Sequence, residues 1–231
     1  MGEALLWGAV AGSSLVIGAL AAYVLELSDR AIGLLLAFGA GTLISAVSFE
    51  LVSDAFDLAG GQEVWLGLAA GALAFYLGKR ALGPSSEGAG QSKAIVLGTV
   101  LDGIPEGIVL GMSLIGGGGG SAAVIGAVFM SNIPEATSST NELKASFTKG
   151  RMFVMWGGIA LATTLSAMLG YAAFDTASNG VVAFTQAFAG GALLAMLSST
   201  MIPDAHEKGN DAVGLVTVLG FAVAFALAEL A

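Results

Sequence analysis

Two Ile-Pro-Glu triplets lie inside long apolar stretches of this sequence, at residues 104–106 and 133–135. Proline has no backbone N–H, so a helix that contains it lacks one hydrogen bond to an earlier carbonyl group. We therefore expect the carbonyl groups of Leu101 and Met130 to lack a helical donor, close to the glutamate of each triplet. In lipid, such a carbonyl is tolerated only where protein or water satisfies it. Each triplet thus predicts a kinked helix that faces the protein interior or a polar path.

Other oxygen-bearing side chains flank the two glutamates at helical spacing. Asp102 precedes Glu106 by four residues and therefore shares its helical face. Ser131 has the same relation to Glu135, and Asn132 lies three residues before that glutamate. Carboxylate, amide and hydroxyl oxygens are the ligands of hard or intermediate divalent cations. The spacing predicts a metal site with the ligands Asp102, Glu106, Glu135, Asn132 and Ser131.

Acidic residues at membrane depth require a physical reason, because each charge there costs about 2.5–3.5 kcal/mol on insertion scales. Carboxylates in one region repel each other unless they are protonated or hold a cation. Two interpretations follow: protonated carboxyl groups that join helices, or a cation site on a conduction path. Kinked helices, freed carbonyls and clustered acids together favour the conduction path.

The composition indicates a membrane protein. Of 231 residues, 56% are hydrophobic and 11% charged, and the mean hydropathy is +0.87; a soluble domain has about 25% charged residues. The 35 glycines suit membrane helices that approach each other closely. There are no cysteines, which excludes disulfides and thiolate ligands, and the net charge of −9 does not suggest a nucleic-acid partner.

The apolar runs predict an all-α, polytopic protein with eight transmembrane helices in a single transporter domain, residues 1–231. A helix needs roughly 20 apolar residues to cross the hydrocarbon core of a bilayer. The expected spans are residues 4–25, 31–56, 64–82, 94–115, 122–140, 152–174, 181–203 and 212–230.

The basic residues predict the orientation of these spans. All of them fall between alternate pairs of apolar runs, and basic residues collect in cytoplasmic loops. They are Arg30, Lys79, Arg80, Lys93, Lys144, Lys149, Arg151 and Lys208. We therefore expect an integral protein of a prokaryotic inner membrane, with the N-terminus outside and the basic loops in the cytoplasm. The N-terminal Met-Gly-Glu lacks the positive region of a cleavable signal peptide, so we expect the first span to be retained.

Residues 38–55 and 188–205 are similar at a constant offset, which matches Phe38 with Phe188 and Gly41 with Gly191. The two segments lie in the second and seventh predicted spans, which run in opposite directions. We therefore predict an inverted repeat that relates spans 1–3 to spans 6–8 around the central pair, spans 4 and 5. The alternative is chance similarity between two helices rich in glycine, alanine and leucine. Inverted repeats are typical of secondary transporters with a substrate site near the bilayer midplane.

Further polar residues suggest a route for a cation. Glu50 and Asp54 lie toward the outer end of the second span, and Asp204 and His206 lie at the inner end of the seventh. The outer pair would recruit cations and the inner pair would release them. The alternatives are solvated residues at helix ends and an ordinary loop histidine.

In the order of these features the chain resembles the ZIP (ZRT/IRT-like) metal transporters. The fourth span of that family typically reads His-Asn-x-Pro-Glu-Gly, and residues 102–107 read Asp-Gly-Ile-Pro-Glu-Gly. Its fifth span carries a similar His-containing motif, and residues 131–135 read Ser-Asn-Ile-Pro-Glu. Residues 50–54 and 200–204 are similar to motifs of its second and seventh spans. The resemblance covers nearly the whole chain and implies eight spans, metal ligands on the two central helices and a homodimer.

The departures from the family pattern concern the metal ligands. Asp102 and Ser131 stand where the family has histidines, and Gly103 stands where it has asparagine. The sixth span often carries Glu-Pro, and the best alignment here gives Thr163 and Thr164. Imidazole ligands favour zinc and neighbouring transition metals. An all-oxygen site should be less selective for zinc, and a second metal beside the first is not expected.

We expect a transporter that moves a divalent metal ion into the cytoplasm by alternating access. The metal, zinc or a relative such as iron or manganese, would be the substrate, with no organic cofactor and no enzymatic activity. Two alternatives remain: a proton- or sodium-coupled carrier of a small organic solute, and a ZIP homologue that has lost transport. A membrane metalloenzyme is disfavoured, because one loop histidine cannot supply a ligand set such as His-Glu-x-x-His.

Overall fold

The computed structural model describes residues 1–82, 89–115 and 120–230, and within these ranges leaves out the side chains of residues 82, 89–95, 97, 98, 101, 102, 120, 121 and 123. The helices are α1 (Gly2–Val24), α2 (Asp29–Ala46), η1 (Val47–Ser53), α3 (Asp54–Ala59), α4 (Gly61–Leu82), α5 (Ala89–Ser113), α6 (Gly120–Leu143), α7 (Lys149–Phe174), α8 (Asn179–Met196), η2 (Leu197–Met201), α9 (Ile202–Gly209), η3 (Asn210–Ala212) and α10 (Val213–Leu230).

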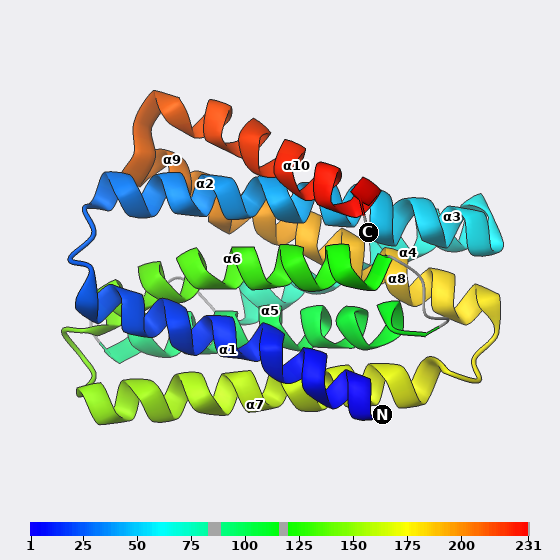
Figure 1. Cartoon of the computed structure of the whole chain (residues 1–231), viewed down its shortest axis with the longest axis horizontal. Coiled ribbons are helices and arrows are strands. Elements are labelled where there is room, and N and C mark those ends of the chain that lie inside the picture. Colours follow the sequence, from blue (N-terminus) through cyan, green and yellow to red (C-terminus); the bar gives the residue numbers. More distant parts are fainter. Residues whose placement is uncertain (83–88, 116–119, 231) are drawn as a thin grey trace.

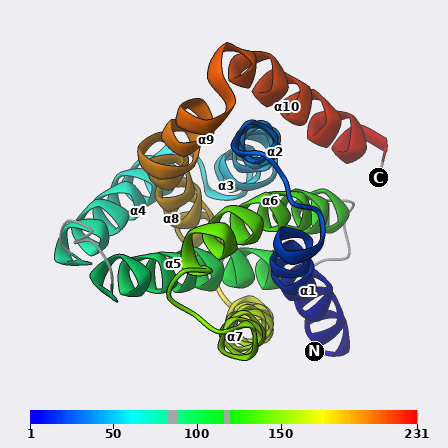
Figure 2. The same cartoon turned by 90° about the vertical axis from the view of Figure 1, so that its left-hand side faces the viewer.

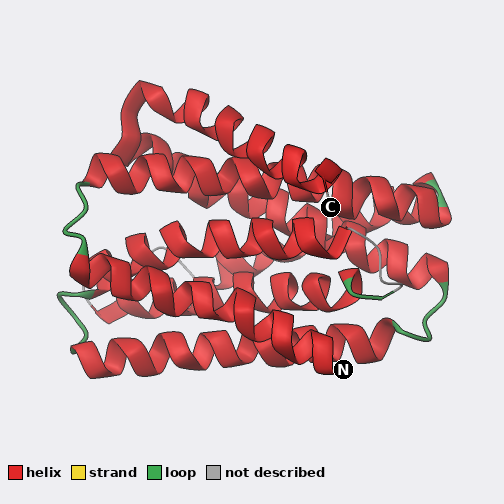
Figure 3. Ribbon diagram, viewed as in Figure 1, coloured by secondary structure: helices red, strands yellow, loops and turns green. Residues whose placement is uncertain are grey.

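The all-α prediction is confirmed, since the described residues form helices and connecting loops without a strand (Figure 3). Each predicted span coincides with a long helix or a continuous helical series. Four stretches of the described chain are long and apolar enough to cross a membrane: Gly2–Val24, Asp29–Ala59, Lys149–Phe174 and Asn179–Leu230. The length and composition of these stretches indicate a membrane protein. The full set of eight spans remains a prediction.

The long helices lie side by side and are joined by loops at both ends of the bundle (Figure 1). Seen from one end, α5 and α6 occupy the middle of the molecule (Figure 2). Helix α6 packs against α1 and α2, and α5 packs against α7 and α8. The two helices that carry the Pro-Glu triplets are thus enclosed by others.

Local signals in the sequence explain where several helices begin and end. Ser28 caps α2, because its Oγ accepts a hydrogen bond from the N–H of Ala31 at 3.3 Å. Thr148 caps α7 in the same way, with the N–H of Arg151 as donor at 3.4 Å. Gly60 follows α3 with φ of +84°, a conformation that glycine adopts without strain and that reverses the chain into α4.

Glycine allows close contact in two helix pairs, α2 with α10 and α4 with α8. A Cβ atom at Gly41 would collide with the carbonyl of Thr217, and one at Gly191 would collide with the carbonyl of Leu68. The partner helices also carry glycines at these contacts. Gly220 of α10 lies against the carbonyl of Phe38 in α2, and Gly71 of α4 lies against the carbonyl of Phe188 in α8. Small residues of this kind are the usual basis of close packing between membrane helices.

Two of the helical series are interrupted by π-helical turns, which we had not predicted. η1 begins at Val47 and η2 at Leu197, positions related by the offset that matches Phe38 with Phe188. The following serines have matching hydrogen bonds: Ser48 Oγ donates to the carbonyl of Ile44, and Ser198 Oγ to that of Leu194, each at 2.8 Å. π-Helical turns are rare and occur often at functional sites.

Candidate metal site

The two Ile-Pro-Glu triplets lie inside α5 and α6, and both helices continue beyond their proline. Glu106 is buried, with 1% of its surface exposed. On α6, Ser131 and Asn132 are buried at 0% and 2%, and Glu135 is half-buried. The structure therefore places four of the predicted ligands in the enclosed part of the bundle.

The fifth predicted ligand, Asp102, lies on α5 one helical turn before Glu106, and its side chain is outside the described residues. Among the described side chains, which include Glu106 and Glu135 but not Asp102, no three acidic or histidine residues are grouped closely enough to hold a metal ion. Neither finding tests the complete five-residue set, which stays a prediction.

The α6 triplet packs against α2 of the second helical series. Gly39 of α2 faces it so closely that a Cβ atom there would lie 3.1 Å from Ser131 Cα and 3.2 Å from Pro134 Cγ. The same atom would lie 2.9 Å from Cε of Met201, at the end of η2. Ser131 Oγ donates to the carbonyl of Val128 at 3.1 Å. The candidate ligand Ser131 is thus in contact with α2, and Gly39 of α2 also lies against Met201 of η2.

The α5 triplet packs against α7 at the positions where the sequence departs from the ZIP pattern. A Cβ atom at Gly103 would lie 3.0 Å from Thr163 Oγ1, and one at Gly107 would lie 2.5 Å from the carbonyl oxygen of Thr163. Thr163 is buried, and its hydroxyl donates to the carbonyl of Ile159 at 3.1 Å. Gly103 and Thr163 are therefore neighbours, and the residues at these two adjacent positions carry no charge.

The residues of the predicted route lie toward opposite ends of the bundle, on η1 and α3 for Glu50 and Asp54 and on α9 for Asp204 and His206 (Figure 1). Glu50 is half-buried and Asp54 is exposed. Asp204 is half-buried and His206 is exposed. Whether a cation passes between the two pairs remains a prediction.

Three charged neighbours of this route were missed by our sequence analysis: Glu229, Glu142 and Lys79. Glu50 interacts electrostatically with Asp54 and also with Glu229 of α10. At the other end, Asp204 lies in the field of Lys208, Glu142, Glu207 and Lys79.

Lys208 forms an ion pair with Glu142 across α9 and α6, with Nζ and Oε1 2.8 Å apart. Lys208 also donates to Ser138 Oγ at 2.7 Å. Directly after α6, Lys144 donates to the carbonyl of Ala22 near the end of α1. These contacts join helices that are distant in sequence, so no short motif could have indicated them.

A curated plant protein is similar to most of this chain. No family model matches the chain. The chain is 28% identical over 206 residues to a protein of Arabidopsis thaliana named "Putative zinc transporter". The aligned region is 84% of this chain and 33% of that protein, so the chain spans about a third of the length of the curated relative it matches. The match is therefore to a part of a protein whose name describes zinc transport.

Proposed function

We propose that this protein is a ZIP-type transporter that moves a divalent metal ion across the membrane into the cytoplasm. The observation that carries the proposal is the burial of Glu106, Ser131 and Asn132 on two enclosed, proline-containing helices. Their order and spacing follow the ZIP motifs, and the similarity to a protein named as a zinc transporter agrees with a metal substrate.

The residues have distinct roles in the proposed site. Glu106 and Glu135 are the main ligands, because their carboxylates supply the charge that a divalent cation requires. Asp102 adds a third carboxylate, while Asn132 and Ser131 contribute neutral oxygens. A site without imidazole binds zinc with less preference over iron or manganese than a site with two histidines. The substrate is therefore a divalent metal of this group, with zinc, iron and manganese as the ions to compare.

Reciprocal contacts support the inverted repeat in this proposal. In the repeat, α2 corresponds to α8, and α4 corresponds to α10. The contact of Gly41 on α2 with Thr217 on α10 therefore corresponds to the contact of Gly191 on α8 with Leu68 on α4. The π-helical turns begin at matching positions, Val47 and Leu197. Two similar three-span units around α5 and α6 suit alternating access, in which the units move relative to the site. The homodimer implied by the family resemblance stays part of the proposal.

Uptake into proteoliposomes tests the function directly. The wild-type protein, Glu106→Gln and Glu135→Gln are reconstituted and supplied with zinc, iron(II) and manganese. We expect wild-type uptake of at least one metal, and a loss in both variants of at least tenfold because each removes a charged ligand. Glu63→Gln, at the start of α4, is the matched control and should transport like the wild type.

The outcomes separate the proposal from its alternatives. Wild-type uptake in both glutamine variants would contradict the assigned site. A folded wild-type protein that moves no metal would favour the organic-solute carrier or a homologue without transport. Metal-dependent thermal stabilisation distinguishes these two, because an organic-solute carrier has no reason to bind the metals.

A further inference from the structure

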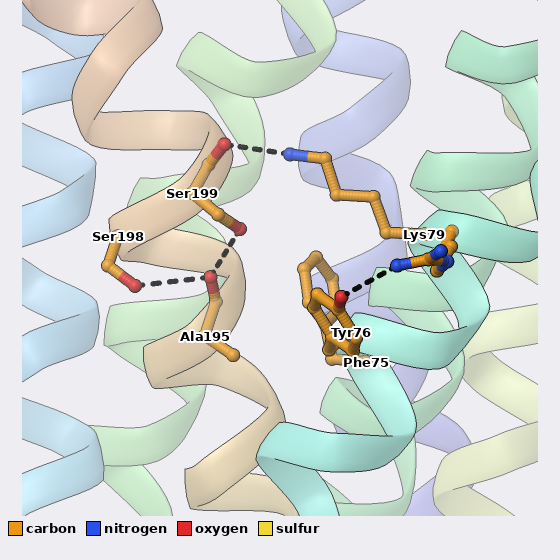
Figure 4. Close-up of a pocket in the computed structure, with 7 residues that line it drawn as sticks. Phe75, Tyr76, Lys79, Ala195, Ser198 and Ser199 are labelled. Carbon is orange, nitrogen blue, oxygen red and sulfur yellow. Dashed lines mark hydrogen bonds between the residues drawn. The ribbon is translucent and has the colours of Figure 1, made fainter. Parts of the chain in front are cut away.

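A groove lies between α4 and the junction of α8 with η2, and none of the transport residues line it. Its volume is about 580 Å³. Apolar and hydroxyl-bearing side chains meet basic ones in its wall: Phe75, Tyr76, Lys79 and Arg80 from α4, and Ala195, Ser198 and Ser199 from the facing helices (Figure 4).

The two cations of the groove are held in place at one side of it. Lys79 Nζ donates to the carbonyl of Ser199 at 2.7 Å and to Thr200 Oγ1 at 3.1 Å. Arg80 Nη1 donates to the hydroxyl of Tyr76 at 3.0 Å. Among the described residues, neither cation has a carboxylate within ion-pair distance. Both side chains are exposed, so they keep N–H donors for an external acceptor.

The groove belongs to the end of the bundle where basic residues gather. Lys79 and Arg80 lie in the last turn of α4, at the end where α9 and the start of α7 also lie (Figure 1). Just before them, α4 exposes Leu73 by 56% and Leu77 by 53%. A surface that is apolar along the helix and cationic at its end matches the boundary between acyl chains and headgroups.

We propose that this groove binds one anionic phospholipid of the cytoplasmic leaflet. The lipid phosphate accepts hydrogen bonds from Arg80 and from the remaining N–H of Lys79, while an acyl chain lies along Phe75 and Ala195. Charge complementarity selects the anionic lipid, because two exposed cations without a described carboxylate at ion-pair distance line the groove. The bound headgroup also contacts η2 through Lys79, which couples the lipid to the π-helical turn. This inference rests on membrane embedding and on the predicted orientation of the chain, and it is independent of the proposed metal transport.

Native mass spectrometry of the full-length protein tests the proposal. The purified protein is exchanged into mixed phosphatidylglycerol and phosphatidylcholine, and the fraction that retains one lipid of each kind is measured. We expect selective retention of phosphatidylglycerol. Lys79→Gln/Arg80→Gln should reduce that selectivity about 25-fold, since each of the two basic residues that contact the bound headgroup contributes roughly fivefold.

Additional variants separate lipid binding from folding. Arg30→Gln/Lys149→Gln removes the same charge from the same end of the bundle and should retain the wild-type selectivity. Arg80→Gln leaves the contact of Lys79 with η2 intact and should still lose about fivefold. Lys79→Arg keeps the charge and should preserve binding.

Three results would overturn the lipid site. They are equal retention of the two lipids by the wild type, unchanged selectivity in the double variant, and an equal loss in the control pair. Displacement of phosphatidylglycerol by millimolar inorganic phosphate would instead identify a soluble anion as the ligand.

Discussion

At the scale of single residues, the chemistry of the proposed site depends on oxygen atoms alone. Glu106, Ser131 and Asn132 are buried on α5 and α6, and Gly103 packs against Thr163 where the ZIP pattern has polar or charged side chains. A ligand set without nitrogen provides little discrimination between zinc and its neighbours. Ion preference should therefore change most when an imidazole is restored.

We predict that Asp102→His increases the preference for zinc over manganese by on the order of tenfold, because imidazole is a better ligand for zinc than for manganese. The ratio of the two uptake rates in proteoliposomes measures this preference. Asp102→Asn is the matched control, since it removes the charge without adding an imidazole, and its ratio should not increase. Equal ratios in the wild type and the histidine variant would exclude residue 102 from the site.

At the scale of helices, close glycine contacts determine how the elements pack. Gly41 and Gly191 lie against the carbonyl groups of Thr217 and Leu68, so the backbones of the paired helices approach each other without intervening side chains. A methyl group at either position must push the partner helix away. Because the two positions correspond in the sequence repeat, the same substitution should have the same effect in both.

We predict that Gly41→Ala and Gly191→Ala each lower the free energy of unfolding by about 1–3 kcal/mol, the usual cost of overpacking. Thermal unfolding in detergent measures the change. Gly157→Ala is the control, because a Cβ atom there meets nothing within 4 Å. It should be neutral or stabilising by up to about 1 kcal/mol, since alanine is the better helix former. A large loss at only one of the repeated positions would argue against equivalent packing.

At the scale of the whole molecule, one end of the bundle is basic, and hydrogen bonds and an ion pair from its lysine side chains connect neighbouring helices. Lys208 pairs with Glu142, Lys144 reaches the end of α1, and Lys79 reaches η2. The opposite end carries the loop between α7 and α8 and the loop after α3 (Figure 1). The enrichment of basic residues predicts that the first end faces the cytoplasm.

Single cysteines test this orientation, because the chain contains no native cysteine. We predict that Thr176→Cys, between α7 and α8, reacts in intact cells with a maleimide that does not cross membranes. Ala145→Cys, between α6 and α7, should react only after the cells are permeabilised. Both positions are exposed, so accessibility within the protein is matched. The reverse labelling pattern would invert the proposed topology and the direction of transport.

Much of the fold could be predicted from local patterns in the sequence. Apolar runs of sufficient length indicated each long helix, and the paired prolines indicated the two helices that carry Glu106 and Glu135. Hydropathy and proline act within a few turns of one helix, so their consequences can be inferred without knowing its neighbours. The π-helical turns at Val47 and Leu197 were not predicted, because a turn with one additional residue has no strong local signature.

By itself, the sequence determined that this protein is all-helical and membrane-embedded and that oxygen-bearing side chains are spaced for a cation on two of its helices. Only the tertiary structure decided that Gly39 packs against both Ser131 and Met201 and that Lys79 contacts η2. Those contacts join residues from distant parts of the chain. They arise from the way the helices pack, and the packing depends on the shapes of all the neighbours together.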